Sequence, residues 1–306
     1  MRLIDWLNVH TFDLDKPVPV HAKTEKIPYV AQWSQHLWVL VHAFIPIVVQ
    51  QLWLSISGSP TIGAWGIFLI YFNMYNIVAI REVHLLRHLG HKYGFLDGDV
   101  HTRDGVPDTG AGKVVSSLFK VTGARIALAI YFTYDSNITP LDAISNWQWW
   151  AWLTLEIGLY CLVLDFWFYW YHRAMHDVDF LWDFHRTHHT TKHPNPLLTA
   201  YADHEQEFFD IVIIPLLTFA SLKAIGLPFG FYEFWICQQY VVFTELWGHS
   251  GIRLHLTPPN TFSWFLQKFD AEIVIEDHDL HHRKGWRKYV SHSNHPLNFT
   301  ANLNNA

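Results

Sequence analysis

Long apolar stretches separated by short polar segments dominate the hydrophobic pattern of this chain. Six stretches approach the roughly 20 residues that a helix needs to cross the hydrocarbon core of a bilayer. In chain order they cover residues 36–55, 62–80, 114–134, 147–171, 208–227 and 231–247. The third is the weakest, because Lys120 and Arg125 interrupt it. The pattern predicts an all-α integral membrane protein with about four to six transmembrane helices.

The distribution of basic residues predicts how these segments are oriented. If all six cross, three short connections lie on one side of the membrane, at residues 57–60, 135–146 and 227–230. Nearly every Lys and Arg then falls on the opposite side or just inside a helix end there, with Lys223 as the exception. Basic residues are retained on the cytoplasmic side, so the second side is predicted to be cytoplasmic. The N-terminus has no apolar core of the signal-peptide kind, and we expect internal segments to direct insertion.

Composition supports a membrane protein and argues against nucleic acid as a partner. Half of the 306 residues are hydrophobic and 16% are charged, below the roughly 25% of typical soluble domains. A soluble all-α protein with buried helices is the alternative, but too many apolar segments reach spanning length. The formal charge of −6 argues against a nucleic-acid partner. Cys161 and Cys237 both lie in apolar runs, which excludes a disulfide scaffold and fits a reducing compartment.

Histidines are concentrated where the apolar segments end on the predicted cytoplasmic side. An HxxxH motif lies just past segment 147–171, an HxxHH motif follows in the next predicted loop, and single histidines occur in DHEQE and WGHSG. A second HxxHH motif comes after the last apolar segment. In chain order these candidate metal ligands are His172, His176, His185, His188, His189, His204, His249, His278, His281 and His282.

This pattern predicts a dimetal site in a histidine-rich cytoplasmic cap. The last two apolar segments form a hairpin, which returns the second histidine-rich segment to the same membrane face as the first. Imidazole nitrogen suits Zn, Cu, Fe and Ni. One ion takes four to six ligands, so eight to ten histidines suit two metals. Packing so many imidazoles together without metal would bury unpaired polar groups, which is unfavourable.

Two acidic residues are candidates for supporting this site. Asp165 precedes His172 by seven residues and shares its helical stripe, and an acid inside a membrane helix is usually functional. Glu245 precedes His249 by four residues and could orient that histidine or bind metal itself. For each of them, a purely structural hydrogen bond is the alternative.

Other histidines have a less specific pattern. His84, His88 and His91 share one helical face, and we interpret them as the polar face of an interfacial helix, although a third ligand group remains an alternative. His255 is ambiguous. His193 and His295 each precede a proline and are interpreted as loop residues.

The ordered motifs HRAMH, HRTHH, WGHSG and HDLHH resemble those of the fatty acid hydroxylase/sterol desaturase superfamily of integral membrane proteins. The resemblance covers roughly residues 150–290. Together with the predicted topology, it divides the chain into a cytoplasmic N-terminal segment (1–35), N-terminal membrane helices with an amphipathic cytoplasmic segment (36–146), a catalytic domain like that of this superfamily (147–290) and a polar tail (291–306). His204 resembles a histidine that sterol-type members carry after the first HxxHH. Glu245 stands where fatty acid 2-hydroxylase-like members have histidine, which puts that subgroup's substrate in doubt.

The resemblance also implies the chemistry. It implies two iron ions, for which zinc can substitute in preparations, and O₂ as the oxidant for hydroxylating or desaturating a lipid or sterol-like substrate taken from the bilayer. The sequence has no GxGxxG unit, no CxxCH motif and nothing resembling a fused cytochrome b5 domain. The resemblance implies that electrons come from NAD(P)H through a separate cytochrome b5 and its reductase. The implied location is the endoplasmic reticulum, with the metal site on the cytoplasmic side.

Several alternatives remain open at the level of sequence. A tailoring oxygenase acting on a polycyclic natural product would have the same motifs. A histidine-based metal transporter would place its ligands near the middle of the spans, and a non-catalytic scaffold would have eroded motifs. The aromatic residues of segment 147–171 could line a substrate path or face lipid; they are Trp149, Trp150, Trp152, Phe166, Trp167, Phe168, Tyr169 and Trp170.

Overall fold

Four long helices form the body of the protein in a computed structural model. The structure describes residues 18–22, 24–98, 111–190, 196–269, 271–272 and 274–284. Four helices within these ranges are long and apolar enough to cross a membrane. They are α2 (Gln32–Ser57), α3 (Ala64–Tyr93), α5 (Ala111–Thr133) and α7 (Trp147–Asp177). The predicted all-α membrane fold is confirmed, and the weak third segment is a helix.

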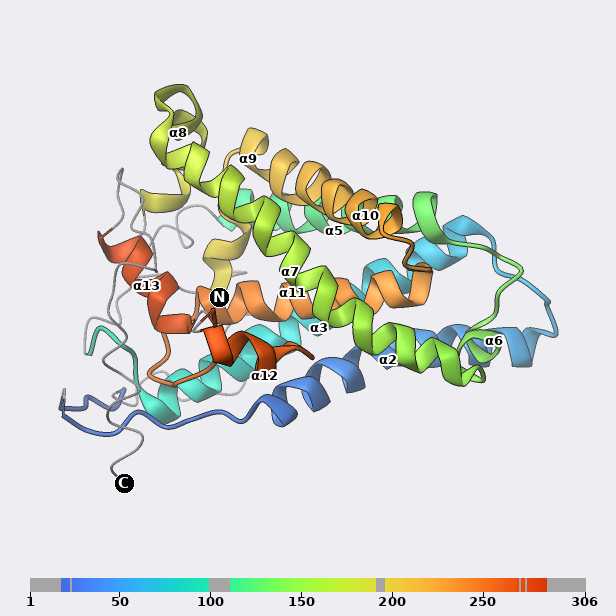
Figure 1. Cartoon of the computed structure of the whole chain (residues 1–306), viewed down its shortest axis with the longest axis horizontal. Coiled ribbons are helices and arrows are strands. Elements are labelled where there is room, and N and C mark those ends of the chain that lie inside the picture. Colours follow the sequence, from blue (N-terminus) through green and yellow to red (C-terminus); the bar gives the residue numbers. More distant parts are fainter. Residues whose placement is uncertain are drawn as a thin grey trace.

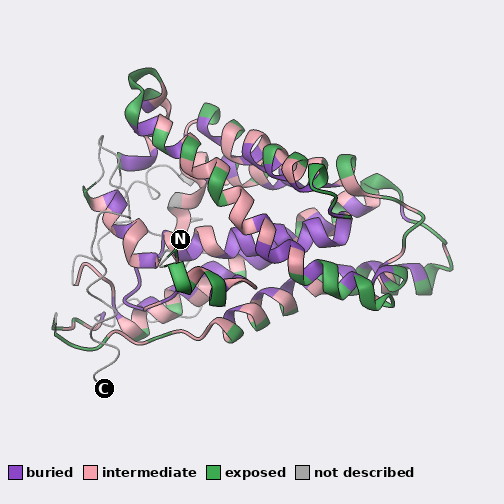
Figure 2. Ribbon diagram, in the orientation of Figure 1, coloured by how far each residue is buried: buried purple, intermediate pink, exposed green. Residues whose placement is uncertain are grey.

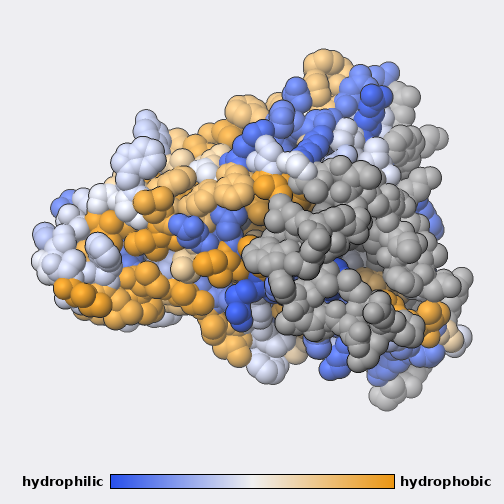
Figure 3. Space-filling model, turned by 180° about the vertical axis from the view of Figure 1, so that it is seen from behind, coloured by the Kyte–Doolittle hydropathy of each residue, from blue (hydrophilic) through white to orange (hydrophobic). Residues whose placement is uncertain are grey.

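The outer faces of these helices carry apolar side chains. Trp33, Leu37 and Leu52 of α2 are exposed, as are Trp150 and Phe166 of α7. An apolar surface of this extent is unfavourable in contact with water, and it is favourable in contact with lipid. Figure 3 shows hydrophobic residues over much of the flank of one face of the molecule, with hydrophilic residues more frequent toward the end that holds the histidine motifs.

The last two apolar segments, which were predicted to form a pair of spans, are not among these four candidate helices. Helix α11 (Phe231–Gly248) lies in the centre of the bundle, and nearly all its residues are buried (Figure 2). Segment 208–227 is divided into the end of α9 (His204–Phe208), the π-helix η3 (Phe209–Ile213) and α10 (Ile214–Ala224). These three elements follow one another without a non-helical residue between them, so the π-helix interrupts the α-helical hydrogen bonding but not the helix. Because neighbouring helices cover α11, its apolar residues face protein rather than lipid.

Short elements close the two ends of the bundle. Helix α6 (Pro140–Ile144) lies at one end, and α8 (Asp179–His185) and α13 (Ile275–Lys284) lie at the other (Figure 1). The remaining short elements are the 3-10 turns η1 (His188–Thr190), η2 (Pro196–Ala200) and η4 (Gln267–Phe269), and helix α12 (Ser263–Leu266). Isolated bridges join Tyr29 to His255 and Phe95 to Ile252, so segments before and after the long helices meet at the histidine-rich end.

Candidate metal centre

The first histidine pair lies in the last turns of helix α7. His172 and His176 are four residues apart, both are buried, and their ring centroids are 5.0 Å apart. The sequence placed this pair just past the end of the helix, but α7 continues to Asp177, and the amide of Val178 still bonds to the carbonyl of Ala174. The helix itself therefore fixes the direction of both rings.

The first HxxHH motif divides its histidines between two positions. His185 ends α8 and His189 lies in η1, and their Nε2 atoms are 3.0 Å apart. His188 points away from His185 and His189, and its Nε2 is 3.2 Å from the Nε2 of His249. The motif was predicted in a loop; it instead occupies a short α-helix and a 3-10 turn.

The second HxxHH motif, in α13, divides its histidines in the opposite sense. His278 lies with its Nε2 3.0 Å from the Nε2 of His249, and its i+4 neighbour His282 lies in the same group. His281 reaches the other group, with its Nε2 2.9 Å from the Nε2 of His172. Adjacent residues of a helix point about 100° apart. In each motif, the first and fifth positions therefore serve one group and the fourth position serves the other.

Nine histidines thus form two groups. In each group, one nitrogen from every residue lies within 4.8 Å of those of the others. Group A consists of His172, His176, His185, His189 and His281, and group B consists of His188, His249, His278 and His282. Two imidazole nitrogens bound to one ion at ~2.1 Å lie ~3.0–3.4 Å apart. The observed Nε2–Nε2 separations of 2.9–3.2 Å agree with that geometry.

The lowered pKa values of histidines in both groups favour binding of a metal ion over protonation. Burial lowers the pKa of His185 to about 3 and that of His249 to about 4. Burial, with neighbouring imidazoles, also holds the pKa of His282 well below its usual range. Neither ring nitrogen of His282 has a hydrogen-bond partner among the described residues, although the side chain is buried. Neutral, buried imidazoles with converging lone pairs fit a bound transition-metal ion, which would compensate for their lost hydration.

Hydrogen bonds to Nδ1 direct Nε2 of two ligands into these groups. Nδ1 of His185 is 3.1 Å from Oε1 of Gln206, and Gln206 in turn donates to Asp210 across 3.2 Å. Nδ1 of His249 is 2.8 Å from the backbone carbonyl oxygen of Glu245. Such partners fix the tautomer and the orientation of a metal-binding ring. Gln206 was not among the residues predicted from the sequence, although its place in DHEQE, two residues after the candidate ligand His204, was an available signal.

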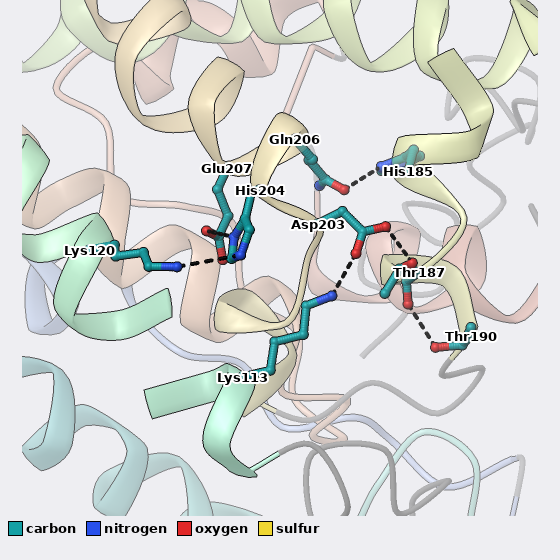
Figure 4. Close-up of polar contacts among 9 residues, drawn as sticks. All are labelled: Lys113, Lys120, His185, Thr187, Thr190, Asp203, His204, Gln206 and Glu207. Atoms are coloured by element: carbon teal, nitrogen blue, oxygen red, sulfur yellow. Dashed lines mark hydrogen bonds and ion pairs between the residues drawn. The ribbon is translucent and has the colours of Figure 1, made fainter. Parts of the chain in front are cut away.

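His204 belongs to neither group. In Figure 4 its ring lies beside Glu207 and Lys120, away from His185 of group A. Its side chain is 67% exposed, with Nδ1 3.2 Å from Glu207 and Nε2 3.4 Å from Lys120. The neighbouring Asp203 instead has a direct structural role. It accepts hydrogen bonds from Lys113 and from Thr187, each across 2.6 Å, and so ties the segment between His185 and His188 to helix α5.

The structure does not bring the Asp165 side chain to the histidines. Asp165 is exposed on α7, and among the described residues no hydrogen bond joins it to an imidazole. It shares the stripe of His172, but seven residues span ~10 Å along a helix axis, too far for direct contact. The Glu245 carboxylate also turns away from His249. It pairs with Arg125, whose Nη2 is 3.4 Å from Oε1, while the backbone of Glu245 contacts the histidine.

The remaining histidines of the sequence analysis join neither group. His84, His88 and His91 lie on the C-terminal part of α3, which extends well beyond the predicted segment 62–80. The ring of His255 is tilted by 32° to that of Tyr29, with the ring centroids 5.8 Å apart, and the backbone carbonyl oxygen of His255 accepts a hydrogen bond from the amide of Val30. His193 and His295 lie outside the described residues.

An apolar cavity of about 150 Å³ borders both groups. His172 and His185 of group A and His188, His249 and His278 of group B contribute to its wall. Most of the rest comes from apolar residues of α3, α5, η2 and α11. Of the eight aromatic residues considered for a substrate path, Phe168 lines this cavity, whereas Trp150, Trp152, Phe166 and Trp170 are exposed on the outer surface.

Comparison with known proteins adds a family context to this geometry. A family model described as fatty acid hydroxylase matches residues 157–302. The chain is 46% identical over 279 residues to "Fatty acid hydroxylase vlmA" of Lecanicillium sp., an alignment that covers 89% of this chain and 76% of the relative. No solved structure matches the chain.

Two more distant relatives each match a little under half of this chain. "Alkylglycerol monooxygenase" of Xenopus tropicalis is 31% identical over 144 residues, which are 45% of this chain and 30% of that protein. "Methylsterol monooxygenase 2-1" of Arabidopsis thaliana is 26% identical over 157 residues, which are 47% of this chain and 53% of that protein. This chain thus spans about a third to a half of these two proteins.

Proposed function

This chain belongs to the fatty acid hydroxylase family, and on that premise we propose that it uses O₂ and electrons to hydroxylate or desaturate a C–H bond of a fatty acyl or sterol-like lipid. Its relatives carry names of lipid hydroxylases and monooxygenases, which makes it an oxidoreductase of this family. The observation that carries the proposal is that nine histidines form two groups, and that histidines of both groups line one apolar cavity.

Groups A and B would each hold one iron ion, and zinc can take the same imidazole ligands. Iron supplies, when bound, the reduction of O₂ and the oxidation of an unactivated C–H bond. The chain itself has three tasks. It keeps the imidazoles neutral by burial, it orients two of them through Gln206 and the carbonyl of Glu245, and it surrounds the reacting carbon with apolar side chains that exclude water.

The cavity is small compared with a whole lipid. An apolar cavity of about 150 Å³ can hold a molecule the size of benzene. We therefore propose that one section of a long substrate lies beside the histidines, while the rest extends between helices toward the bilayer. This arrangement supports a membrane-derived substrate, because its apolar chain never has to cross water.

We further propose that electrons come from NAD(P)H through a separate cytochrome b5 and its reductase, at the cytoplasmic face of the endoplasmic reticulum. The excess of Lys and Arg at the histidine-rich end supports this orientation. Protease protection of a tag inserted after Gly58, at the opposite end of α2, would test it in sealed microsomes. Digestion of that tag without detergent would contradict the proposed orientation.

The substrate is best tested by expression in a host whose lipids and sterols are profiled by mass spectrometry. We expect a lipid that gains one oxygen atom or loses two hydrogen atoms, and no such product with His188→Ala. A wild-type protein that carries two iron ions but leaves the profile identical to that of the variant would contradict a fatty acyl or sterol substrate. Such a result would favour the alternative of a polycyclic natural product.

A histidine-based transporter is disfavoured by the position of the ligands. It requires ligands near the middle of the spans. Here the histidines lie in the last turns of α7, at the end of α11 and in the short elements α8, η1 and α13, all at one end of the bundle (Figure 1).

A further inference from the structure

Several residues that line the cavity have a buried polar atom with no hydrogen-bond partner among the described residues. These atoms include Oγ of Ser117, Nε of Arg125 and Oε1 of Glu207. All three residues line the apolar cavity that borders the histidine groups, and all three are less than 9% exposed. Buried polar groups are almost always paired. Unpaired polar atoms gathered on one apolar cavity therefore indicate a ligand with a polar group.

Arg125 is the most firmly positioned of the three. Its Nη1 donates to Oε1 of Gln238 across 3.1 Å, and its Nη2 lies 3.4 Å and 3.5 Å from the two carboxylate oxygens of Glu245. Gln238 is itself held by the hydroxyl of Tyr160. These contacts fix the guanidinium between α5, α7 and α11, and they leave its Nε–H as a donor without a partner.

The charges of the wall discriminate between polar groups. The positive charge of Arg125 is already compensated by Glu245, and Glu207 and Asp210 add two further carboxyl side chains to the same wall. A ligand carboxylate would meet three carboxyl groups and one compensated guanidinium. A neutral oxygen can accept a hydrogen bond from Arg125 without adding a charge to this environment.

We infer that the cavity selects a lipid bearing a neutral oxygen function, such as an ester carbonyl or a hydroxyl, which accepts the Nε–H of Arg125, and that it discriminates against a free carboxylate. The inference rests on the proposed function, because it takes the cavity as the substrate site. It makes Arg125 and Glu245 determinants of specificity. Glu245 lies one turn before His249, ~6 Å along the helix axis, so the anchored oxygen lies near the metal centre without occupying it.

Binding of defined probes tests the inference without any need for turnover. Methyl stearate, stearyl alcohol, stearic acid and octadecane are compared by equilibrium binding to the purified protein, loaded with zinc and without reductant. We expect the ester or the alcohol to bind about tenfold more tightly than either the acid or the hydrocarbon, the effect of one hydrogen bond from a charged donor. The relative affinities of ester and alcohol identify which oxygen function the cavity prefers.

Substitution of Glu245 gives the sharper test. Glu245→Gln removes the compensating charge and keeps the size of the side chain. The affinity for stearic acid should therefore rise about tenfold relative to the affinity for methyl stearate. Glu233→Gln is the matched control. It changes a buried carboxyl group of the same helix that does not line the cavity, and it should leave the ratio unchanged.

A double variant separates the loss of ligand recognition from a loss of protein stability. Arg125→Met with Glu245→Leu removes both charges together, so that neither partner of this partly buried ion pair is left with an uncompensated charge. Methyl stearate should then bind no better than octadecane. The inference is overturned if all four probes bind the wild-type protein equally, or if Glu245→Gln leaves the ratio of acid to ester unchanged. Either result would leave the proposed oxygenase activity standing, because that activity is measured separately from products in the lipid-profiled host.

Discussion

Gln206 holds the ring of His185 in one orientation through a single hydrogen bond. Its Oε1 lies 3.1 Å from Nδ1, which leaves Nε2 directed at His189 and the rest of group A. The side chain does not join the candidate ligands itself. At the scale of single residues, the choice between the two ring nitrogens therefore depends on neighbours outside the histidine motifs.

Gln206→Leu should weaken metal binding by group A while leaving the fold intact. Loss of a hydrogen-bond partner of this kind typically lowers metal affinity or activity about 10–100-fold. Metal per chain, measured by elemental analysis during dialysis against a weak chelator, gives the effect. Asp165→Asn is the matched control and should retain its metal, because no imidazole contacts Asp165 among the described residues. Equal retention by both variants would contradict the role of Gln206.

Single histidine substitutions should remove metal from one group at a time. His281→Ala takes a ligand from group A and His188→Ala takes one from group B, so each variant should fall from about two ions per chain to about one and lose turnover. His204→Ala should keep both ions and its activity, since its side chain is 67% exposed and apart from both groups. Loss of metal from His204→Ala would restore this residue to the ligand set.

Close packing of helix α7 fixes where its histidines stand. At Gly158, an added Cβ atom would lie 2.5 Å from Oγ1 of Thr261 and 2.6 Å from the ring of Phe262. Asn260 also donates to the carbonyl of Gly158. The segment after α11 therefore lies directly against α7 at a position where no side chain fits. This contact helps to set how α7 lies relative to the segment that leads to α13.

Gly158→Ala should destabilise the protein by about 1–3 kcal/mol, the usual effect of overpacking a close contact. Gly123→Ala is the matched control in α5, where the nearest atom to an added Cβ is 3.9 Å away. Alanine has the higher helix propensity, so this second variant should be neutral or more stable by about 0.5–1 kcal/mol. Thermal unfolding in detergent measures both. A Gly158→Ala protein as stable as wild type would show that the neighbouring loop can move aside.

At the scale of the whole molecule, each histidine group joins segments that are far apart in sequence. Group A links α7, α8 and η1 to α13, and group B links η1 to the end of α11 and to α13. Metal bound to both groups would therefore crosslink the chain from His172 to His282. Binding that requires the folded arrangement stabilises the fold in proportion to its free energy.

The purified protein should contain about two transition-metal ions per chain, and their removal by a strong chelator should lower its Tm by several degrees. The double variant His188→Ala with His281→Ala serves as the control, because the chelator should leave its unfolding curve unchanged. One ion per chain in an active preparation would contradict the dimetal centre. An unchanged Tm after complete metal removal would contradict the crosslinking role.

The sequence by itself determined the class of the fold and the set of histidines that come together. Spanning length and apolar composition are local properties, so α2, α3, α5 and α7 could be predicted from the chain. The spacing of HxxxH and HxxHH places histidines four residues apart on one face of a helix, and nine of the ten predicted histidines meet in two groups.

Only the tertiary structure decided how those histidines divide and what supports them. Whether α11 faces lipid or protein depends on the helices packed around it, which its apolar composition does not encode. Asp165 and Glu245 were predicted to support the histidines because of their helical spacing. Contact with a histidine ring also requires that the two residues be close along the helix axis and that the carboxylate have no stronger partner. Arg125 provides that partner for Glu245, from a helix 120 residues away in sequence. The hydrogen bond of Gln206 likewise depends on how α8 and α9 pack together, and local sequence spacing carries no information on such a contact.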